Sequence, residues 1–65
     1  NPVRDQVHII LGREDVILVY SVSGIKLLQL EGKTGDNLVD LRSLARGIYF
    51  IRTKAGGQQT KIIKQ

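Results

Sequence analysis

VILVYSV-SG-IKLLQL, residues 16–30, consists of two apolar segments joined by a tight turn. Residues 16–22 form an almost unbroken apolar run, which predicts a central strand with both faces at least partly covered. Gly24 can adopt the positive φ that a tight hairpin requires. Residues 25–30 are therefore expected to return antiparallel beside the first segment.

The rest of the chain also has the patterns of β-strands, and no stretch keeps helical spacing for more than one turn. Apolar alternation predicts a strand over about 6–11, a short one around 38–41 and a final one over about 58–64. The run IYFIRT, residues 48–53, has the character of a second central strand. We predict an all-β fold, a compact immunoglobulin-like β-sandwich of about six to seven short, mainly antiparallel strands.

Polar and glycine-containing segments separate these strands. Residues 31–37, EGKTGDN, are expected to form a loop, and residues 56–57 the turn of the last hairpin. Residues 40–47 are expected to form a compact corner. In that corner we expect Ser43 to bond to backbone N–H groups ahead of it and Gly47 to adopt a left-handed conformation.

The 65 residues allow one small domain, residues 1–65, and there is no cysteine to reinforce it. The net charge of +4 is unevenly distributed, because residues 1–40 have four bases and six acids whereas residues 41–65 have six bases and no acid. This bias either directs the C-terminal third toward an anionic partner or provides a solvated face. The apolar runs are too short for a membrane span, so no direct membrane insertion is expected.

Residues suited to catalysis or metal binding are sparse, so no enzyme activity, metal site or cofactor is predicted. His8 is the single histidine and alternates with Val7 and Ile9, which places it on the surface face of its strand. One histidine without cysteine cannot form a zinc site, and the loop carboxylates lack the spacing of a calcium motif. No serine has a histidine or lysine at a meaningful spacing to activate it.

The basic character raises the alternative of nucleic-acid binding. Proteins that bind single strands place aromatic platforms beside a basic groove. This chain has three aromatic residues, and the adjacent Tyr49 and Phe50 must point to opposite faces of one strand, so at least one belongs to the core. Nucleic acid is therefore not the expected partner.

Four segments of the chain recur together, in this order, in one known family. They are the N-P-x-x-D start within residues 1–9, Val19-Tyr20 followed by Gly24, VDLRSLARGIY at residues 39–49, and KIIKQ at residues 61–65. Over essentially all 65 residues the chain resembles the C-terminal sorting domain of type IX secretion cargo, the Por secretion system C-terminal sorting domain. Two positions depart from the family pattern and are expected to adjust the hairpin: Ser21 replaces a common aspartate, and the base Lys26 comes one place late.

The resemblance implies a secretion signal that is a fragment of a longer secreted protein. Its partners would be the type IX outer-membrane translocon, a shuttle protein, and a surface sortase that cuts upstream and can anchor the cargo to lipopolysaccharide. The cargo would cross the periplasm and end at the outer-membrane surface or outside the cell. The residues that match the family pattern, and so are the recognition candidates, are Gly47, Ile48, Tyr49, Lys61, Ile62, Ile63, Lys64 and Gln65, with Asn1, Pro2 and Asp5 as the N-terminal motif.

Recognition has a physical hypothesis as well. If the last strand lies at a sheet edge, its unpaired backbone groups are a template on which a partner adds a strand. Lys61 and Lys64 would then discourage self-association and match an acidic receptor. An edge-paired or strand-swapped dimer is a further expectation. The alternative function is an immunoglobulin-like structural or adhesive accessory module of a cell-surface protein.

Overall fold

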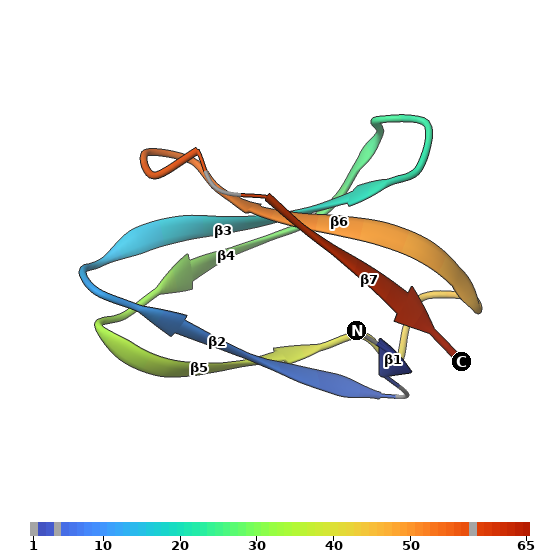
Figure 1. Ribbon diagram of the computed structural model, residues 1–65, viewed down its shortest axis with the longest axis horizontal. Coiled ribbons are helices and arrows are strands. Elements are labelled where there is room, and N and C mark those ends of the chain that lie inside the picture. The colour runs from blue at the N-terminus through green and yellow to red at the C-terminus, as the bar shows by residue number, and fades with distance from the viewer. Residues whose placement is uncertain (1, 4, 58) are drawn as a thin grey trace.

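The computed structural model describes residues 2–3, 5–57 and 59–65, which form a two-layered β-structure (Figure 1). Its strands are β1 (Pro2–Val3), β2 (Gln6–Leu11), β3 (Asp15–Ser21), β4 (Lys26–Gly32), β5 (Gly35–Asp40), β6 (Gly47–Thr53) and β7 (Gln59–Lys64). Five strands form the main sheet, in the order β1-β7-β6-β3-β4, and β2 and β5 form the small sheet that faces it. The all-β, immunoglobulin-like sandwich is therefore confirmed.

Strand β3 is the central strand that its apolar run predicts. It pairs antiparallel with β4 on one side and with β6 on the other. Ile17 and Val19 face the small sheet and are fully buried. Leu18, on the opposite face, is only 6% exposed because it lies between Gln29 of β4 and Arg52 of β6.

The β3–β4 hairpin forms as expected. Gly24 has a φ of 91°, and its N–H donates to the Ser21 carbonyl at 2.9 Å. The Ser21 hydroxyl accepts a hydrogen bond from the Ile25 N–H at 3.1 Å. The serine that departs from the family pattern thus fixes the return of the chain. Just before it, the register of β3 with β4 shifts between Val19 and Tyr20.

The loop predicted over residues 31–37 is wrong in its extent, since β4 continues to Gly32 and β5 begins at Gly35. Asn37 explains the difference, because its buried side-chain amide forms the hydrogen bonds that allow a short connection between the two strands. Its Oδ1 accepts from the Lys33 N–H at 2.8 Å, and its Nδ2 donates to the Lys33 carbonyl at 2.8 Å and to the Ile9 carbonyl at 3.2 Å. These bonds satisfy the backbone of the connection and tie it to β2.

The corner after β5 forms, but two of its details differ from expectation. Within the described residues it is Asp40, and not Ser43, that bonds to the backbone ahead, accepting from the Arg42 N–H at 2.9 Å. Gly47 has a φ of 158°, which is nearly extended and not left-handed helical. The reason is that Gly47 already belongs to β6, where it pairs with Lys64.

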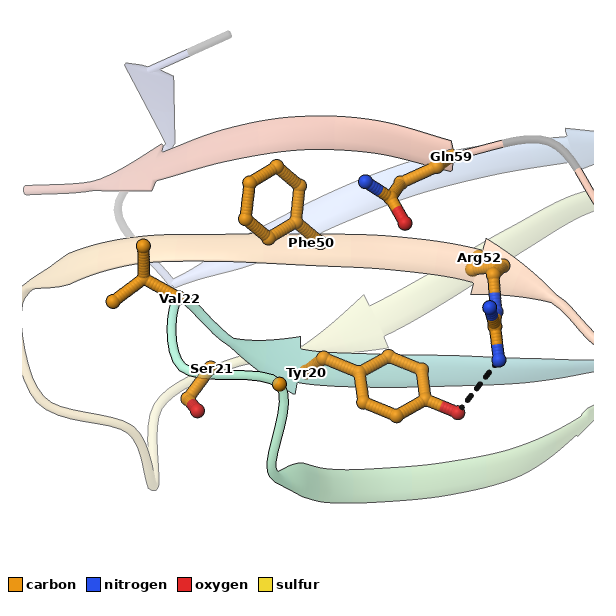
Figure 2. A pocket seen from close by; sticks show the side chains of 7 residues that line it. Tyr20, Ser21, Val22, Phe50, Arg52 and Gln59 are labelled. Atoms are coloured by element: carbon orange, nitrogen blue, oxygen red, sulfur yellow. Dashed lines mark hydrogen bonds between the residues drawn. The ribbon is translucent and has the colours of Figure 1, made fainter.

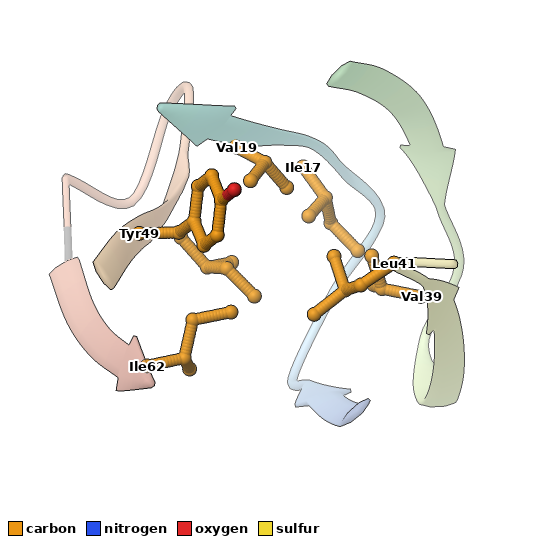
Figure 3. Close-up of a cluster of buried hydrophobic side chains, with 7 residues drawn as sticks. Ile17, Val19, Val39, Leu41, Tyr49 and Ile62 are labelled. Carbon is orange, nitrogen blue, oxygen red and sulfur yellow. The ribbon is translucent and has the colours of Figure 1, made fainter. Parts of the chain in front are cut away.

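The core lies between the two sheets (Figure 3). It contains the buried side chains of Ile17, Val19, Val39, Leu41, Tyr49, Ile51 and Ile62. Tyr49 is 8% exposed and its hydroxyl donates to the Ala45 carbonyl, so the aromatic side chain also fastens the corner that precedes β6. Phe50 points to the other face of the same strand, as the sequence predicts.

Replacing Asn37 with alanine is expected to lower the free energy of unfolding by about 1–3 kcal/mol, because the change leaves part-buried backbone groups of the β4–β5 connection without their side-chain partners. Urea titration of the chain measures the loss. Thr34→Ala, an exposed substitution in the same connection, is the matched control and should change the value by no more than about 0.5 kcal/mol. Equal losses in the two variants would contradict the role assigned to the amide.

Candidate functional site

Strand β7 carries four of the predicted recognition residues, Lys61 to Lys64, and lies next to one edge of the main sheet. On one side it pairs antiparallel with β6. On its other side β1 pairs with it in parallel, but only through Pro2 to Ile63 and Val3 to Lys64. On the side away from β6, residues 59–62 therefore have no neighbouring strand among the described residues. The open edge on which the strand-addition hypothesis depends is present along this part of β7, whereas β1 covers the last two residues of the strand.

The register of β6 and β7 divides the recognition candidates between two faces, because successive residues of a strand point in opposite directions. Tyr49 pairs with Ile62, and both side chains belong to the core, with exposures of 8% and 1%. Ile48 pairs with Ile63 on the outer face of the main sheet, the face turned away from the small sheet. These two isoleucines are 41% and 38% exposed, so they form an apolar pair open to a partner.

The side chains of the two lysines of β7 point to opposite faces of the main sheet. Lys61 pairs with Phe50 and is exposed on the outer face. Lys64 is three residues further along the strand, so it points to the opposite side, and it is half-buried beside Gly47. Gln65 follows the strand and is exposed. A flat acidic receptor can therefore meet Lys61 without meeting Lys64.

The N-terminal motif is placed only in part. Asn1 lies outside the described residues, and Pro2 belongs to β1. Asp5 is exposed, and its backbone carbonyl accepts a hydrogen bond from the Leu41 N–H at 2.7 Å. Because Leu41 is fully buried, this bond ties the start of the chain to the corner before β6.

Asp15 fixes the turn from which β7 begins. From the start of β3, its carboxylate accepts hydrogen bonds from the N–H groups of Ala55 and Gly56, both at 3.0 Å, and of Val16 at 2.7 Å. The Ala55 bond is the main reason that the pKa of Asp15 lies below its ordinary value. The hairpin at Gly56 and Gly57 is confirmed, with a φ of 72° at Gly57.

Asp40 and Arg42 form the second charged contact near the site. The guanidinium donates to both carboxylate oxygens, with the shorter bond, Nη2 to Oδ2, at 2.8 Å. These bonds and the bond from the Arg42 N–H lower the pKa of Asp40 to about 2, and the same pairing raises the pKa of Arg42. The acid of the family-like VDLRSL segment thus has a structural role in the corner.

His8 lies on the exposed face of β2, as the sequence predicts, and its Nδ1 is 2.9 Å from the Asp36 carboxylate across the small sheet. In residues 2–3, 5–57 and 59–65 no group of three or more His, Cys, Asp or Glu side chains is arranged to hold a metal ion. The same residues contain no helix that is long and apolar enough to span a membrane.

A hollow on the outer face of the main sheet is the feature that sequence reasoning missed (Figure 2). Tyr20 of β3 pairs with Phe50 of β6, and Arg52 lies two residues beyond Phe50 on the same face. The Arg52 Nη2 donates to the Tyr20 hydroxyl at 3.1 Å, and its guanidinium carbon is 5.0 Å from the centroid of the tyrosine ring. The two strands are far apart in sequence, so only the pairing register brings these side chains together.

Acid titration is expected to expose the roles of Asp15 and Asp40. Both carboxylates have a folded-state pKa below the ordinary value of 3.8, so the stability they contribute is present above that value and is lost as the pH falls toward 2. The melting temperature should change little above about pH 5 and should fall steeply below about pH 4.

The matched comparison is Asp40→Asn against Glu14→Gln. Asp40→Asn should melt at a lower temperature than the unchanged chain at neutral pH, and its decline between pH 4 and 2 should be shallower. Glu14 is exposed, and its substitution should leave the fall of the melting temperature between pH 4 and 2 unchanged. An identical fall of the melting temperature between pH 4 and 2 in all three proteins would contradict the stabilising role of Asp40.

Comparison with known protein families gives a match that extends over the whole chain. The family described as the secretion system C-terminal sorting domain matches residues 1–65. Neither the curated proteins nor the solved structures gave a significant match. The match covers both the segments that resemble the family in sequence and the hairpins that hold β7 in place.

Proposed function

Because this chain belongs to the family of type IX secretion C-terminal sorting domains, we propose that it directs a linked cargo through the type IX outer-membrane translocon. Members of the family are non-catalytic sorting signals of secreted or cell-surface proteins. The observation that carries the proposal is the family match over residues 1–65. In this proposal the chain is the single C-terminal domain of a longer protein, it is read by the translocon and its shuttle protein after transit of the periplasm, and a surface sortase then releases or anchors the cargo.

The open part of β7 supports a mode of recognition. Residues 59–62 have β6 on one side and no neighbouring strand on the other among the described residues, so their outward N–H and C=O groups are available to a partner strand. β-strand addition gives affinity through main-chain bonds, and side-chain pockets then supply specificity. The two-residue parallel pairing with β1 limits how far such a strand can extend, because Ile63 and Lys64 are already paired.

The outer face beside this edge supports a role for Lys61. Its exposed ammonium lies next to the Ile48–Ile63 pair. A partner that adds a strand to the edge of β7 could therefore place its own acidic side chains near Lys61 and its apolar side chains near the two isoleucines. Rim charges act mainly on encounter and specificity. Tyr49 and Ile62 act differently in this proposal, since their buried side chains contribute by keeping β6 and β7 folded.

The proposal predicts that the chain, fused to the C-terminus of a reporter with a secretory signal, exports the reporter from a host that has type IX machinery. Deletion of residues 61–65 should abolish export, because it removes the core residue Ile62 and shortens β7. Lys61→Glu leaves the core intact and should reduce export by about three- to tenfold. The measurement is the fraction of reporter found outside the cell.

Lys33→Glu is the matched control for charge, since Lys33 is exposed in the β4–β5 connection and lies outside β6 and β7. This variant should export like the unchanged fusion, and the melting temperatures of both lysine variants should agree. Undiminished export after deletion of residues 61–65 would overturn the proposed function. The accessory-module alternative rests on the sandwich fold alone, which many functions share.

A further inference from the structure

The hollow on the outer face of the main sheet has the size and lining of a small binding site (Figure 2). Its volume is about 360 Å³, at the lower end of the range for ligand pockets. Phe50 and Tyr20 line its floor, Val22 borders it from the β3–β4 turn, and Arg52 and Gln59 lie toward its other end. It therefore joins an apolar region to a cationic one within one recess.

Arg52 is the charged group of this recess and is oriented before any partner arrives. Its contact with the Tyr20 ring and hydroxyl uses part of the guanidinium, which has five N–H donors in a rigid fork. None of the residues that line the hollow is acidic, and the ion pairs found within the described residues are His8 with Asp36 and Arg42 with Asp40. The remaining donors of Arg52 are thus suited to a carboxylate from outside the chain.

Exposed apolar side chains extend the surface at the end of the hollow away from the Arg52 guanidinium (Figure 2). Val22 is 68% exposed at the edge of the hollow, although a valine in a two-sheet domain gains stability by burial. Ile48 and Ile63 are exposed on the same face of the main sheet. Val22, Ile48 and Ile63 are three of the seven large apolar side chains that are exposed among the described residues, and they add apolar surface next to the hollow.

We infer that this hollow is a docking site for an acidic segment of a partner protein, which places one carboxylate on Arg52 and a neighbouring apolar side chain between Val22 and Phe50. The inference rests on the proposed function, because the partner would be a component of the secretion machinery. The charge near the hollow supports it, since Lys61 pairs with Phe50 on the same face and no acid lines the hollow. Glu31 also lies on this face, but it pairs with Val16 at the far end of β3. A recessed site with a single guanidinium fits one carboxylate, whereas an anionic lipid surface binds clusters of protruding bases.

The first test is the export of the reporter fusion carrying Arg52→Glu, compared with Lys54→Glu. Both changes reverse one base in the C-terminal third, but Lys54 lies in the turn between β6 and β7 and does not line the hollow. Loss of a charge-assisted hydrogen bond predicts a drop in export of about tenfold or more for Arg52→Glu. Lys54→Glu should stay within about twofold of the unchanged fusion. Arg52→Lys keeps the charge without the planar fork and should restore part of the export.

The second test concerns the apolar part of the hollow and uses two changes from an apolar residue to serine in one turn. Val22→Ser removes a side chain that borders the hollow, and Ile25→Ser removes one that is also exposed, at 62%, but does not line it. Neither side chain belongs to the core, so both variants should keep the melting temperature of the unchanged fusion. Export should fall for Val22→Ser and remain for Ile25→Ser.

The outcomes separate the docking site from the proposed function. Normal export of Arg52→Glu, or equal losses for Arg52→Glu and Lys54→Glu, would overturn the docking site and leave the sorting function standing. Failure of the unchanged fusion to be exported would overturn both. Sedimentation of the purified fusion with phosphatidylglycerol vesicles that is lost in Arg52→Glu would assign the face to lipid and overturn the protein partner.

Discussion

The burial of β3 against the small sheet is the contact on which the rest of this domain depends. Ile17 and Val19 are fully buried between the two layers, in one core cluster with Val39 of β5 and with Leu41, which follows β5. A domain this small has one core, and because it has no cysteine, no disulfide bond can compensate for the loss of that core. Because β6 pairs with β3, and β7 pairs with β6, the position of β7 at the sheet edge follows from this contact.

Polar contacts then determine how β7 is presented. Asp15 binds the turn before β7 from the start of β3, and Asp40 binds the corner before β6. The two acids lie in the N-terminal part of the chain, and each holds backbone or basic groups of the C-terminal part. Two of the acids in residues 1–40 are therefore engaged in structural contacts. Arg52 and Lys61, two of the bases in residues 41–65, are exposed on the outer face of the main sheet.

Much of the fold follows from local sequence patterns. The apolar run of β3 and the positive φ of Gly24 could be predicted because each depends on its own segment. The full length of β5 could not, since it depends on hydrogen bonds from Asn37 to residues on other segments. The hollow was beyond prediction for the same reason, because the register of β3 and β6 brings Tyr20 to Arg52. The two-residue strand β1 was missed because so short a segment has no periodicity.

In the proposed mode of recognition, a partner strand pairs with the open part of β7. Hydrogen–deuterium exchange of the domain, alone and with the purified shuttle protein of a type IX system, tests it most directly. We predict slower exchange at the outward amides of residues 59–62 when the shuttle protein is added, with little change at Ile63 and Lys64, which already pair with β1. Binding that leaves the exchange of residues 59–62 unchanged would contradict it.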